Sequence, residues 1–233
     1  MTGAPQIWAI VPVKSLAAAK RRLSPLLDGS ERQVLARAMF EDVLNACMAA
    51  GSLAGTVVVT ADDEVRRIGD RAGARIVTEP RERGTNAAIE TGIRAVTGCA
   101  TGVIVVPADI PHVTAGSLDA VARLCSSKAF VLVPASRDGG TNLLACTPPD
   151  LIGTSFGPGS FQRHLQEGVR AGMQPLLPSL DRLDLDLDRP EDIQAFLDLP
   201  SNTRTRRVLL DLSIPARLGT GPMPHECGAW LAI

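Results

Sequence analysis

The sequence predicts one α/β domain built on a mostly parallel, mixed β-sheet with flanking helices. Short runs rich in valine and isoleucine alternate with helical stretches along most of the chain, which is typical of parallel strands joined by crossover helices. A turn with two adjacent glycines interrupts this alternation and indicates one antiparallel pair. The length of 233 residues suits a single core and is short for two domains.

Four parallel strands are predicted from runs of β-branched residues that end at a turn. Helices cover both faces of a parallel sheet, so its strands are expected to be continuously apolar rather than alternating. The runs are residues 7–13, 56–60, 74–78 and 103–106.

The clearest predicted helix covers residues 30–50, where apolar side chains recur every three or four residues. Ser30 and Gln33 form a candidate capping box at its start, and Gly51 follows its end. Further helices are predicted at residues 64–72, 86–96, 116–126 and 160–171, and one more begins near Pro190.

Two additional strands are predicted at residues 130–134 and 143–146. The segment Asp138-Gly139-Gly140 between them has the composition of a tight turn, because glycine adopts positive φ angles without strain. The sheet is therefore expected to be mixed.

The character of the sequence changes after Leu199. Residues 201–207 are polar and basic, and prolines and glycines recur from Pro215 to Pro224. Such a composition disfavours a regular packed element. We therefore expect a domain of residues 1–199 followed by a loosely attached tail of residues 200–233.

Charge and composition exclude several classes of partner. The formal net charge is −1 and aromatic residues make up 3% of the chain, so neither the basic field nor the stacking platform of a nucleic-acid-binding protein is expected. The sequence has no apolar run of membrane-spanning length, and Pro12 and Lys14 interrupt the apolar segment near its start. We expect a cytoplasmic protein whose partners include neither nucleic acid nor a membrane.

The cysteines and histidines do not form a recognisable site in the sequence. The five cysteines are widely spaced without a Cys-x-x-Cys pair, so neither a disulfide framework nor a zinc site is predicted. The histidines are His112, His164 and His225, and they also lack the spacing of metal ligands. Both residue types are expected to be structural or to lie on the surface.

A basic segment follows the first predicted strand. Lys14, Lys20, Arg21 and Arg22 lie beyond the end of that strand, and ligands of open α/β sheets bind at the carboxyl ends of the strands. Lysine supplies a compact charge and arginine a two-pronged donor, which suits a triphosphate. A solvated basic loop would have the same composition, so both interpretations stay open. No Walker motif is present, which excludes a P-loop enzyme.

Two acidic segments are candidates for a metal site. Asp109 follows the fourth predicted strand at the same sheet edge. Three later aspartates alternate with leucines and share one face if the segment is extended: Asp184, Asp186 and Asp188. Carboxylate oxygens are suitable ligands for Mg²⁺. The alternative is an acidic strand edge before a helix whose dipole the acids complement, which we adopt for Glu191 and Asp192 only.

A glycine-rich turn precedes the helix predicted at residues 160–171. The segment Phe156-Gly157-Pro158-Gly159-Ser160 presents free amides at a helix start, and with the Ser160 hydroxyl it could bind a phosphate. Thr141, after the double glycine, could add another hydroxyl. A Gly-Pro-Gly segment is usually only a turn, and this alternative also stays open.

Six short motifs follow one another along the chain: Val11-Pro12-Val13-Lys14 with Ala19-Lys20-x-Arg22-Leu23, Gly84-Thr85-Asn86-Ala87-Ala88, Pro107-Ala108-Asp109-Ile110-Pro111, Asp138-Gly139-Gly140-Thr141-Asn142, Phe156-Gly157-x-Gly159-Ser160 and Asp186-x-Asp188-x-Pro190-Glu191-Asp192. Together they resemble one family, the guanylyltransferases of coenzyme F-420 biosynthesis that act on 2-phospho-L-lactate, phosphoenolpyruvate or 3-phosphoglycerate. The resemblance extends to about Leu199.

This resemblance implies a nucleotide-diphospho-sugar transferase-like fold with GTP over the carboxyl edge of the sheet and residues 79–86 near the guanine. The residues expected at the nucleotide are Asn86 and, around the triphosphate, Lys14, Lys20 and Arg22. The residues that it implies as ligands of Mg²⁺, the expected cofactor, are Asp109, Asp186 and Asp188. The residues that it places at the phospho-acid are Thr141, Gly157 and Ser160.

The expected reaction is direct transfer of GMP from GTP to the phosphate of a three-carbon phospho-acid, with pyrophosphate as the leaving group and Lys14, Lys20, Arg22 and Asp109 as catalytic residues. Alignment and charge neutralisation drive such a transfer without a protein nucleophile. Phosphoenolpyruvate, 2-phospho-L-lactate and 3-phospho-D-glycerate stay open as acceptors, and the oligomeric state is unknown. The alternatives are a nucleotidyltransferase for a sugar phosphate or molybdopterin and a non-catalytic GTP-binding regulator.

Overall fold

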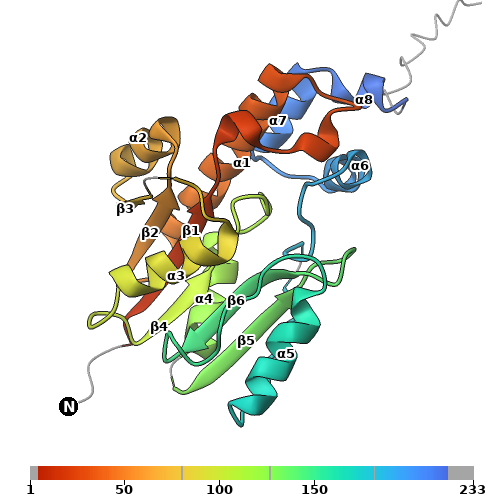
Figure 1. Ribbon diagram of the computed structural model, residues 1–233. Coiled ribbons are helices and arrows are strands. Elements are labelled where there is room, and N and C mark those ends of the chain that lie inside the picture. The colour runs from red at the N-terminus through yellow and green to blue at the C-terminus, as the bar shows by residue number, and fades with distance from the viewer. Residues whose placement is uncertain (1–4, 80, 126, 181, 220–233) are drawn as a thin grey trace, which may run out of the picture.

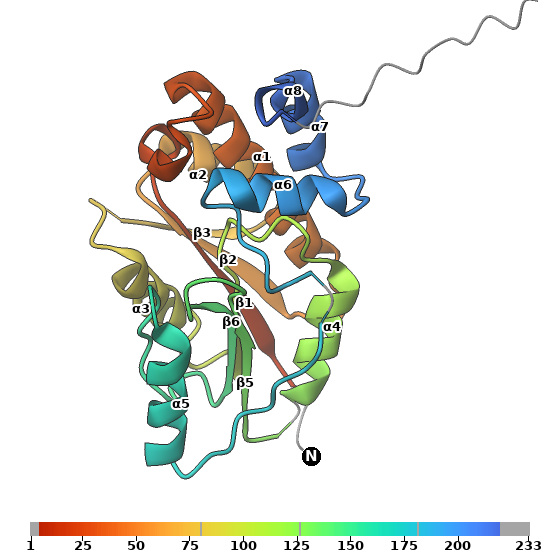
Figure 2. The same ribbon diagram turned by 90° about the vertical axis from the view of Figure 1, so that its right-hand side faces the viewer.

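The computed structural model describes residues 5–79, 81–125, 127–180 and 182–219. Its centre is a six-stranded sheet between two layers of helices (Figure 1 and Figure 2). The strands lie in the order β3-β2-β1-β4-β6-β5. Their bounds are β1 (Ile7–Val13), β2 (Gly55–Thr60), β3 (Arg75–Thr78), β4 (Gly102–Val105), β5 (Ala129–Pro134) and β6 (Thr141–Thr147).

The sheet is mixed, as predicted. β1 pairs in parallel with β2 and β4, and β2 with β3, whereas β6 is antiparallel to both β4 and β5. The carboxyl ends of β1 to β4 therefore share one edge with the start of β6. The turn before β6 is the predicted one: Gly139 has a φ of +66°, and the N–H of Gly140 donates to Asp138 Oδ1 at 2.7 Å.

Helices cover both faces of the sheet, with α3 and α5 on one face and α4 on the other (Figure 2). Side chains of α1 and α2 belong to the same hydrophobic cluster as those of α4. None of the helices in the described residues is both long and apolar enough to cross a membrane. The bounds are η1 (Leu16–Ala18), η2 (Arg21–Leu23), α1 (Gly29–Ala49), α2 (Asp63–Arg71), α3 (Thr85–Ala95), α4 (Ala115–Leu124), α5 (Ser160–Arg170) and α6 (Pro190–Asp198).

Neighbouring residues of the central strand β1 pack against opposite helical layers. Val11 lies in the cluster with α1, whereas Ile10 lies in the cluster with α3. A Cβ atom added at Gly92 of α3 would lie 2.5 Å from Ile10 Cγ2, so only glycine lets α3 approach β1 this closely. Because α3 follows β3, the start of α3 lies at the carboxyl edge of the sheet.

The capping box predicted at Ser30 and Gln33 is wrong. The N-cap of α1 is Asp28, whose Oδ1 accepts a hydrogen bond from the N–H of Glu31 at 2.9 Å. Glu31 Oε2 accepts in return from the N–H of Asp28, also at 2.9 Å. The two pairs have the same spacing in the sequence, and the charged pair forms because carboxylates interact favourably with the amino end of a helix.

The segment after Leu199 is packed, so the expectation of a loosely attached tail is wrong for residues 200–219. α7 (Arg204–Asp211) packs along α1 and is followed by α8 (Ile214–Arg217) (Figure 1). Leu209 and Ile214 are fully buried in the cluster that contains α1. A few apolar side chains within a basic segment are enough to bury one face of a short helix. Residues 220–233 lie outside the described residues.

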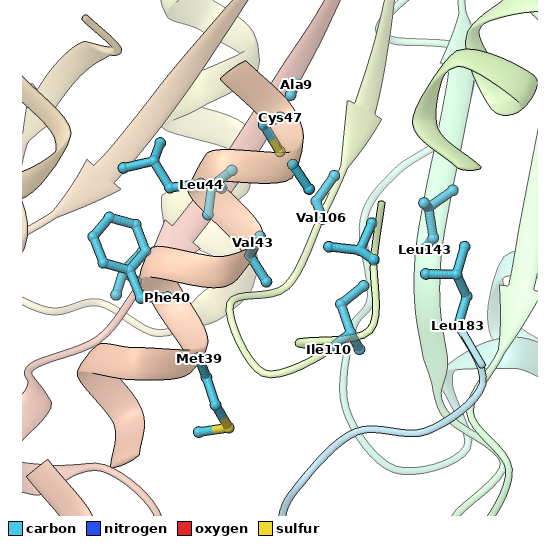
Figure 3. Close-up of a cluster of buried hydrophobic side chains, with 14 of the residues drawn as sticks. Ala9, Met39, Phe40, Val43, Leu44, Cys47, Val106, Ile110, Leu143 and Leu183 are labelled. Atoms are coloured by element: carbon cyan, nitrogen blue, oxygen red, sulfur yellow. The ribbon is translucent and has the colours of Figure 1, made fainter. Parts of the chain in front are cut away.

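The larger hydrophobic cluster reaches the carboxyl edge of the sheet. Figure 3 shows Val43 of α1 facing Val106 and Ile110, with Leu143 of β6 and Leu183 beyond them. Val106 and Ile110 lie on either side of Asp109 in the sequence. Their burial fixes the backbone around Asp109, and the burial of Leu183 anchors the acidic segment beside it.

Candidate active site

Three carboxylates from two distant parts of the chain lie together at the carboxyl edge of the sheet. Asp109 follows β4, and Asp186 and Asp188 precede α6. One oxygen of each carboxylate lies within 4.8 Å of an oxygen of each of the others. The Asp109 and Asp188 side chains are 32% and 37% exposed, so the cluster is open to solvent. The structure thus brings together the three aspartates expected to form a metal site.

The acidic segment is attached to the edge of the sheet by three hydrogen bonds, one of which the N–H of Ser136 donates to the carbonyl oxygen of Asp184 at 2.8 Å. The N–H of Leu187 donates to the carbonyl oxygen of Asp109 at 3.1 Å, and Asn142 Nδ2 donates to the carbonyl oxygen of Leu183 at 3.0 Å. The three leucines of the segment are buried, so the aspartates between them face outward, as the alternation predicts. Asp184 is exposed and lies outside the carboxylate cluster.

Asp192 does more than complement the dipole of α6, which corrects the role expected for it. Its side chain is almost fully buried, and Oδ2 accepts hydrogen bonds from the N–H groups of Asp188 at 3.0 Å and Arg189 at 2.7 Å. Arg137 Nε lies 2.6 Å from Asp192 Oδ1 and balances its charge. Asp192 therefore fixes the backbone of Asp188. The spacing of four residues at a helix start was the only sequence signal for this contact.

Lys20 lies between two of the three clustered carboxylates. Its Nζ is 2.8 Å from Asp109 Oδ2 and 2.6 Å from Asp188 Oδ1, and its side chain is 9% exposed. Arg22 Nη1 lies 3.3 Å from Asp188 Oδ2. Both cations were expected at a triphosphate. In this structure they pair with the aspartates, because the clustered carboxylates are the unbalanced charges within their reach.

Lys14 lies at the start of the loop that carries Lys20. It is exposed and forms no ion pair with the residues that the structure describes. The loop is tied to its neighbours, since the N–H of Leu16 donates to Asp62 Oδ2 at 3.0 Å and the N–H of Ser15 donates to the carboxylate of Glu82. These bonds hold the backbone next to Lys14, and its exposed side chain places a positive charge at the end of β1.

Three groups of the cluster, Lys20, Asp186 and Asp188, have shifted pKa values. Burial lowers the pKa of Lys20, but the negative charges and hydrogen bonds of Asp109 and Asp188 raise it by more. The pKa of Lys20 therefore lies above its ordinary value. Burial raises the pKa of Asp186 to about 6, and the charges of Asp109 and Asp188 add to this effect. Burial also disfavours the charged form of Asp188, yet Lys20 outweighs it and keeps that pKa low. Asp186 is therefore the least compensated carboxylate.

A second polar cluster lies where β6 meets α5. Thr141 and Ser160 are buried, and Ser160 Oγ donates to Thr141 Oγ1 at 3.2 Å. His164, also fully buried, places Nδ1 at 2.9 Å from Thr141 Oγ1. Leu144 of β6 pairs with Val105, so Thr141 at the start of β6 lies at the edge where Asp109 follows β4. His164 was expected to be structural or to lie on the surface, although its four-residue spacing from Ser160 places both on one helix face.

The amino end of α5 does not present the free amides that were expected as a phosphate site. The turn at residues 138–140 folds onto this end and supplies acceptors. The N–H groups of Gly159, Ser160 and Phe161 donate to the carbonyl oxygens of Asp138, Gly157 and Gly139 at 3.2, 3.0 and 3.0 Å. The expectation is wrong for these three amides. The N–H of Gly157, where φ is +129°, has no acceptor within the described residues.

Asn86 contacts the glycine-rich turn. Its Nδ2 donates to the carbonyl oxygen of Phe156 at 3.1 Å, and its Oδ1 accepts from the N–H of Phe156 at 2.7 Å. The amide thus bonds to both backbone groups of one residue, and it keeps a second N–H and a second oxygen lone pair for other partners. Asn86 therefore links α3 to the turn before α5, and its role at the nucleotide stays a prediction.

Glu79, Arg81 and Arg83, which belong to the segment expected near the guanine, form one wall of a groove of about 470 Å³. Glu79 is 7% exposed, and its Oε1 lies 4.0 Å from Arg83 Nε without a hydrogen-bond partner in the described residues. A buried carboxylate oxygen in this state is a strong acceptor for a ligand. The groove is lined by Thr78, Glu79, Arg81, Arg83, Thr91 and Arg94.

The other histidine and three of the cysteines within the described residues are buried, whereas Cys99 is exposed. His112 is buried and stacks on Phe196 of α6 with ring centroids 4.2 Å apart. Burial raises the pKa of the Cys47 thiol to about 12, which keeps it unreactive. The free thiols are Cys47, Cys99, Cys125 and Cys146. His225 and Cys227 lie outside the described residues.

Comparisons with known proteins identify the family of this chain. Residues 7–224 match the family described as "Guanylyl transferase CofC like". The chain is 38% identical to a 3-phospho-D-glycerate guanylyltransferase from Phenylobacterium zucineum (strain HLK1), over 88% of this chain and 95% of that protein. It is 34% identical to a phosphoenolpyruvate guanylyltransferase from Sphaerobacter thermophilus, over 80% of this chain and 90% of that protein.

The fold is also known from solved structures. A protein from Desulfovibrio desulfuricans G20, assigned to the nucleotide-diphospho-sugar transferases, superposes with a TM-score of 0.74 over 92% of this chain and 98% of that chain, at 16% identity. At this identity the superposition establishes a shared fold. The family match covers most of the chain and two relatives exceed 30% identity, and the chain therefore belongs to the CofC-like guanylyl transferases.

Proposed function

We propose that this chain transfers GMP from GTP to the phosphate of a three-carbon phospho-acid in coenzyme F-420 biosynthesis. The observation that carries the proposal is the carboxylate cluster of Asp109, Asp186 and Asp188 at the ligand-binding edge of a guanylyl transferase. An oxygen of the acceptor phosphate forms a bond to the α-phosphorus of GTP, the bond between that phosphorus and the bridging β-oxygen breaks, and pyrophosphate leaves. The names of two relatives support an acid with three carbons and one phosphate.

The donor set fits a hard divalent cation such as Mg²⁺. Asp109, Asp186 and Asp188 offer oxygens close enough to share one ion, and their partial exposure leaves room for water and phosphate oxygens in the remaining positions. A bound Mg²⁺ would neutralise charge on the triphosphate. The protein holds the carboxylates in place beforehand through Leu187 and Asp192.

The basic loop supplies further positive charge. Lys14 and Arg22 are exposed at the same sheet edge, where they can bind the triphosphate and the departing pyrophosphate. Lys20 balances Asp109 and Asp188 when no ligand is bound, and its flexible stem allows the ammonium to contact phosphate oxygens as well. Neutralised and aligned reactants are the main requirement of this reaction class.

Selection of guanine is assigned to Glu79. Guanine carries an N1–H and an exocyclic amino group on one edge, and both can donate to a carboxylate, whereas adenine presents an acceptor at N1. The buried Oε1 of Glu79 without a hydrogen-bond partner supports this assignment. Exchange of Glu79 for glutamine should raise the KM of GTP and reduce its preference over ATP. Unchanged nucleotide preference in that variant would place the base elsewhere.

The acceptor is assigned to Thr141 and to the N–H of Gly157, which has no acceptor within the described residues. Ser160 is fully buried and its hydroxyl donates to Thr141, so Ser160 supports the site instead of contacting the acid directly. An alcohol and an amide are suitable donors for a carboxylate or phosphate oxygen.

The test is release of pyrophosphate from GTP and Mg²⁺ in the presence of 3-phospho-D-glycerate, phosphoenolpyruvate or 2-phospho-L-lactate, with ATP and CTP as control donors. The expected result is release with GTP and one preferred acid, together with a guanylylated product of matching mass. Release only with a sugar phosphate or molybdopterin would reassign the acceptor. Binding of GTP without any release would favour a regulatory protein over an enzyme.

A further inference from the structure

The hydrogen bonds of His164 determine which of its ring nitrogens carries the proton. Nε2 accepts from the backbone N–H of Ser155 at 3.0 Å, so this nitrogen is unprotonated. A neutral imidazole then carries its proton on Nδ1, which lies 2.9 Å from Thr141 Oγ1. His164 is therefore the donor in its contact with Thr141.

The Thr141 hydroxyl consequently accepts two hydrogen bonds. One comes from His164 Nδ1–H and the other from Ser160 Oγ–H, at 2.9 and 3.2 Å. A hydroxyl oxygen has two lone pairs, so both are occupied and only its own proton is left for a further bond. No acceptor for this proton is found within the described part of the chain. Thr141 can therefore only donate to a ligand.

We propose that His164 is a positioning residue that makes the Thr141 hydroxyl an obligatory donor to an anionic oxygen of the acceptor acid. This inference rests on the proposed function, because Thr141 is assigned to the acceptor there. A hydroxyl that could also accept would tolerate a protonated or amide group in the same place. One that can only donate selects carboxylate or phosphate oxygens.

The surroundings of His164 maintain this arrangement. The ring of Phe156 packs edge-on against the imidazole at a centroid distance of 5.1 Å, and Asn86 holds the backbone of Phe156. Burial lowers the pKa of His164 to about 4, Arg163 lowers it as well, and Glu167 raises it slightly. The imidazole thus stays neutral around pH 7, and a proton on Nε2 would face the N–H of Ser155.

The first experiment measures the tautomer and needs no substrate. Nitrogen-15 NMR of the full chain labelled at histidine distinguishes protonated from bare ring nitrogens, and the His164→Asn spectrum identifies the signals of His164. We expect a protonated Nδ1 and a bare Nε2 from about pH 8 down to about pH 5. A protonated Nε2 in this range would overturn the inference.

The second experiment is a double-mutant cycle on the KM of the acceptor acid. His164→Gln should raise this KM about tenfold while the KM of GTP changes less than about twofold, because only the acceptor contact is weakened. His164→Asn keeps an amide N–H near the position of Nδ1 and should recover part of the loss. Gln166→Ala, an exposed change on the same helix, is the matched control.

The cycle is completed with Thr141→Val, which removes the hydroxyl and keeps the shape. If His164 acts through Thr141, His164→Gln adds little to the KM of the acid in the Thr141→Val background. Equal effects of His164→Gln in both backgrounds would reduce His164 to a structural residue. If the unmodified enzyme uses none of the three acids, the proposed function fails, and the NMR result alone decides whether His164 orients Thr141.

Discussion

The backbone N–H of Leu187 donates to the carbonyl oxygen of Asp109 at 3.1 Å, and this bond holds two distant acidic motifs side by side. Asp186 and Asp188 flank Leu187, so this bond places their carboxylates beside that of Asp109. Carboxylates of like charge do not attract one another, so the cluster does not assemble through its own side chains. The buried leucine and the peptide hydrogen bond supply the attraction that the carboxylates lack. Backbone contacts and buried leucines therefore hold the site together, so single carboxylates can be substituted without removing these contacts.

Removal of the Asp192 side chain should weaken metal activation. Asp192→Ala frees the backbone of Asp188, and loss of such supporting hydrogen bonds lowers metal affinity about tenfold or more. Asp192→Asn can still accept these bonds and should have a smaller effect. The measurement is the Mg²⁺ concentration that gives half-maximal pyrophosphate release. Glu191→Gln is the exposed control, and equal Mg²⁺ dependence in the Asp192→Ala and control variants would contradict the role of Asp192.

Replacement of Lys20 by methionine should destabilise the metal-free protein and increase its stabilisation by Mg²⁺. Loss of the ammonium leaves Asp109 and Asp188 uncompensated, which costs about 1–3 kcal/mol at this partly exposed site. The readout is the melting temperature in chelator and in excess Mg²⁺. Arg21→Met is the matched control, because Arg21 is exposed and forms no ion pair within the described residues. Identical Mg²⁺ shifts in both variants would show that Lys20 and the metal use different groups.

The stability of the metal-free protein should depend on pH through Asp186. Burial and two neighbouring carboxylates raise its pKa to about 6 in the folded state, above the unfolded value of 3.8. Its contribution to stability is therefore fully present below about pH 4 and is lost as the pH rises through about 6. In chelator, Asp186→Asn should be more stable than the unmodified protein by about 1 kcal/mol at about pH 8.

The difference in stability between Asp186→Asn and the unmodified protein is measured by their melting temperatures. It should shrink as the pH is lowered to about 4, where Asp186 is protonated. Binding of Mg²⁺ has the opposite pH dependence and should weaken as the pH falls through about 6, since protons compete for the carboxylate. A variant that is less stable than the unmodified protein at about pH 8 in chelator would disprove the raised pKa.

Shortening Leu209 should destabilise the whole domain. Leu209 of α7 is fully buried against the α1 layer, so Leu209→Ala should lower the free energy of unfolding by about 2–4 kcal/mol. The neighbouring Leu210 is 49% exposed, and Leu210→Ala should change it by less than about 1 kcal/mol. Urea unfolding monitored by circular dichroism measures both. Similar small changes in the two variants would mean that α7 contributes little to the fold.

The sequence by itself determined the α/β class, the mixed sheet and the exposed face of the acidic segment. These features depend on local patterns: valine and isoleucine runs between helices, a double glycine between two strands, and aspartates alternating with the leucines at 183, 185 and 187. Each pattern expresses the backbone geometry of a few neighbouring residues, which is why it can be recognised without the fold.

Only the tertiary structure decided which polar groups meet. Lys20 pairs with Asp109 and Asp188, and the side-chain amide of Asn86 bonds to the backbone of Phe156. Thr141 meets both Ser160 and His164, and no functional role was predicted for His164. These contacts join residues far apart in the chain. They depend on the strand order β1-β4-β6 and on which competing partner lies within hydrogen-bonding distance, and no local pattern encodes that distance.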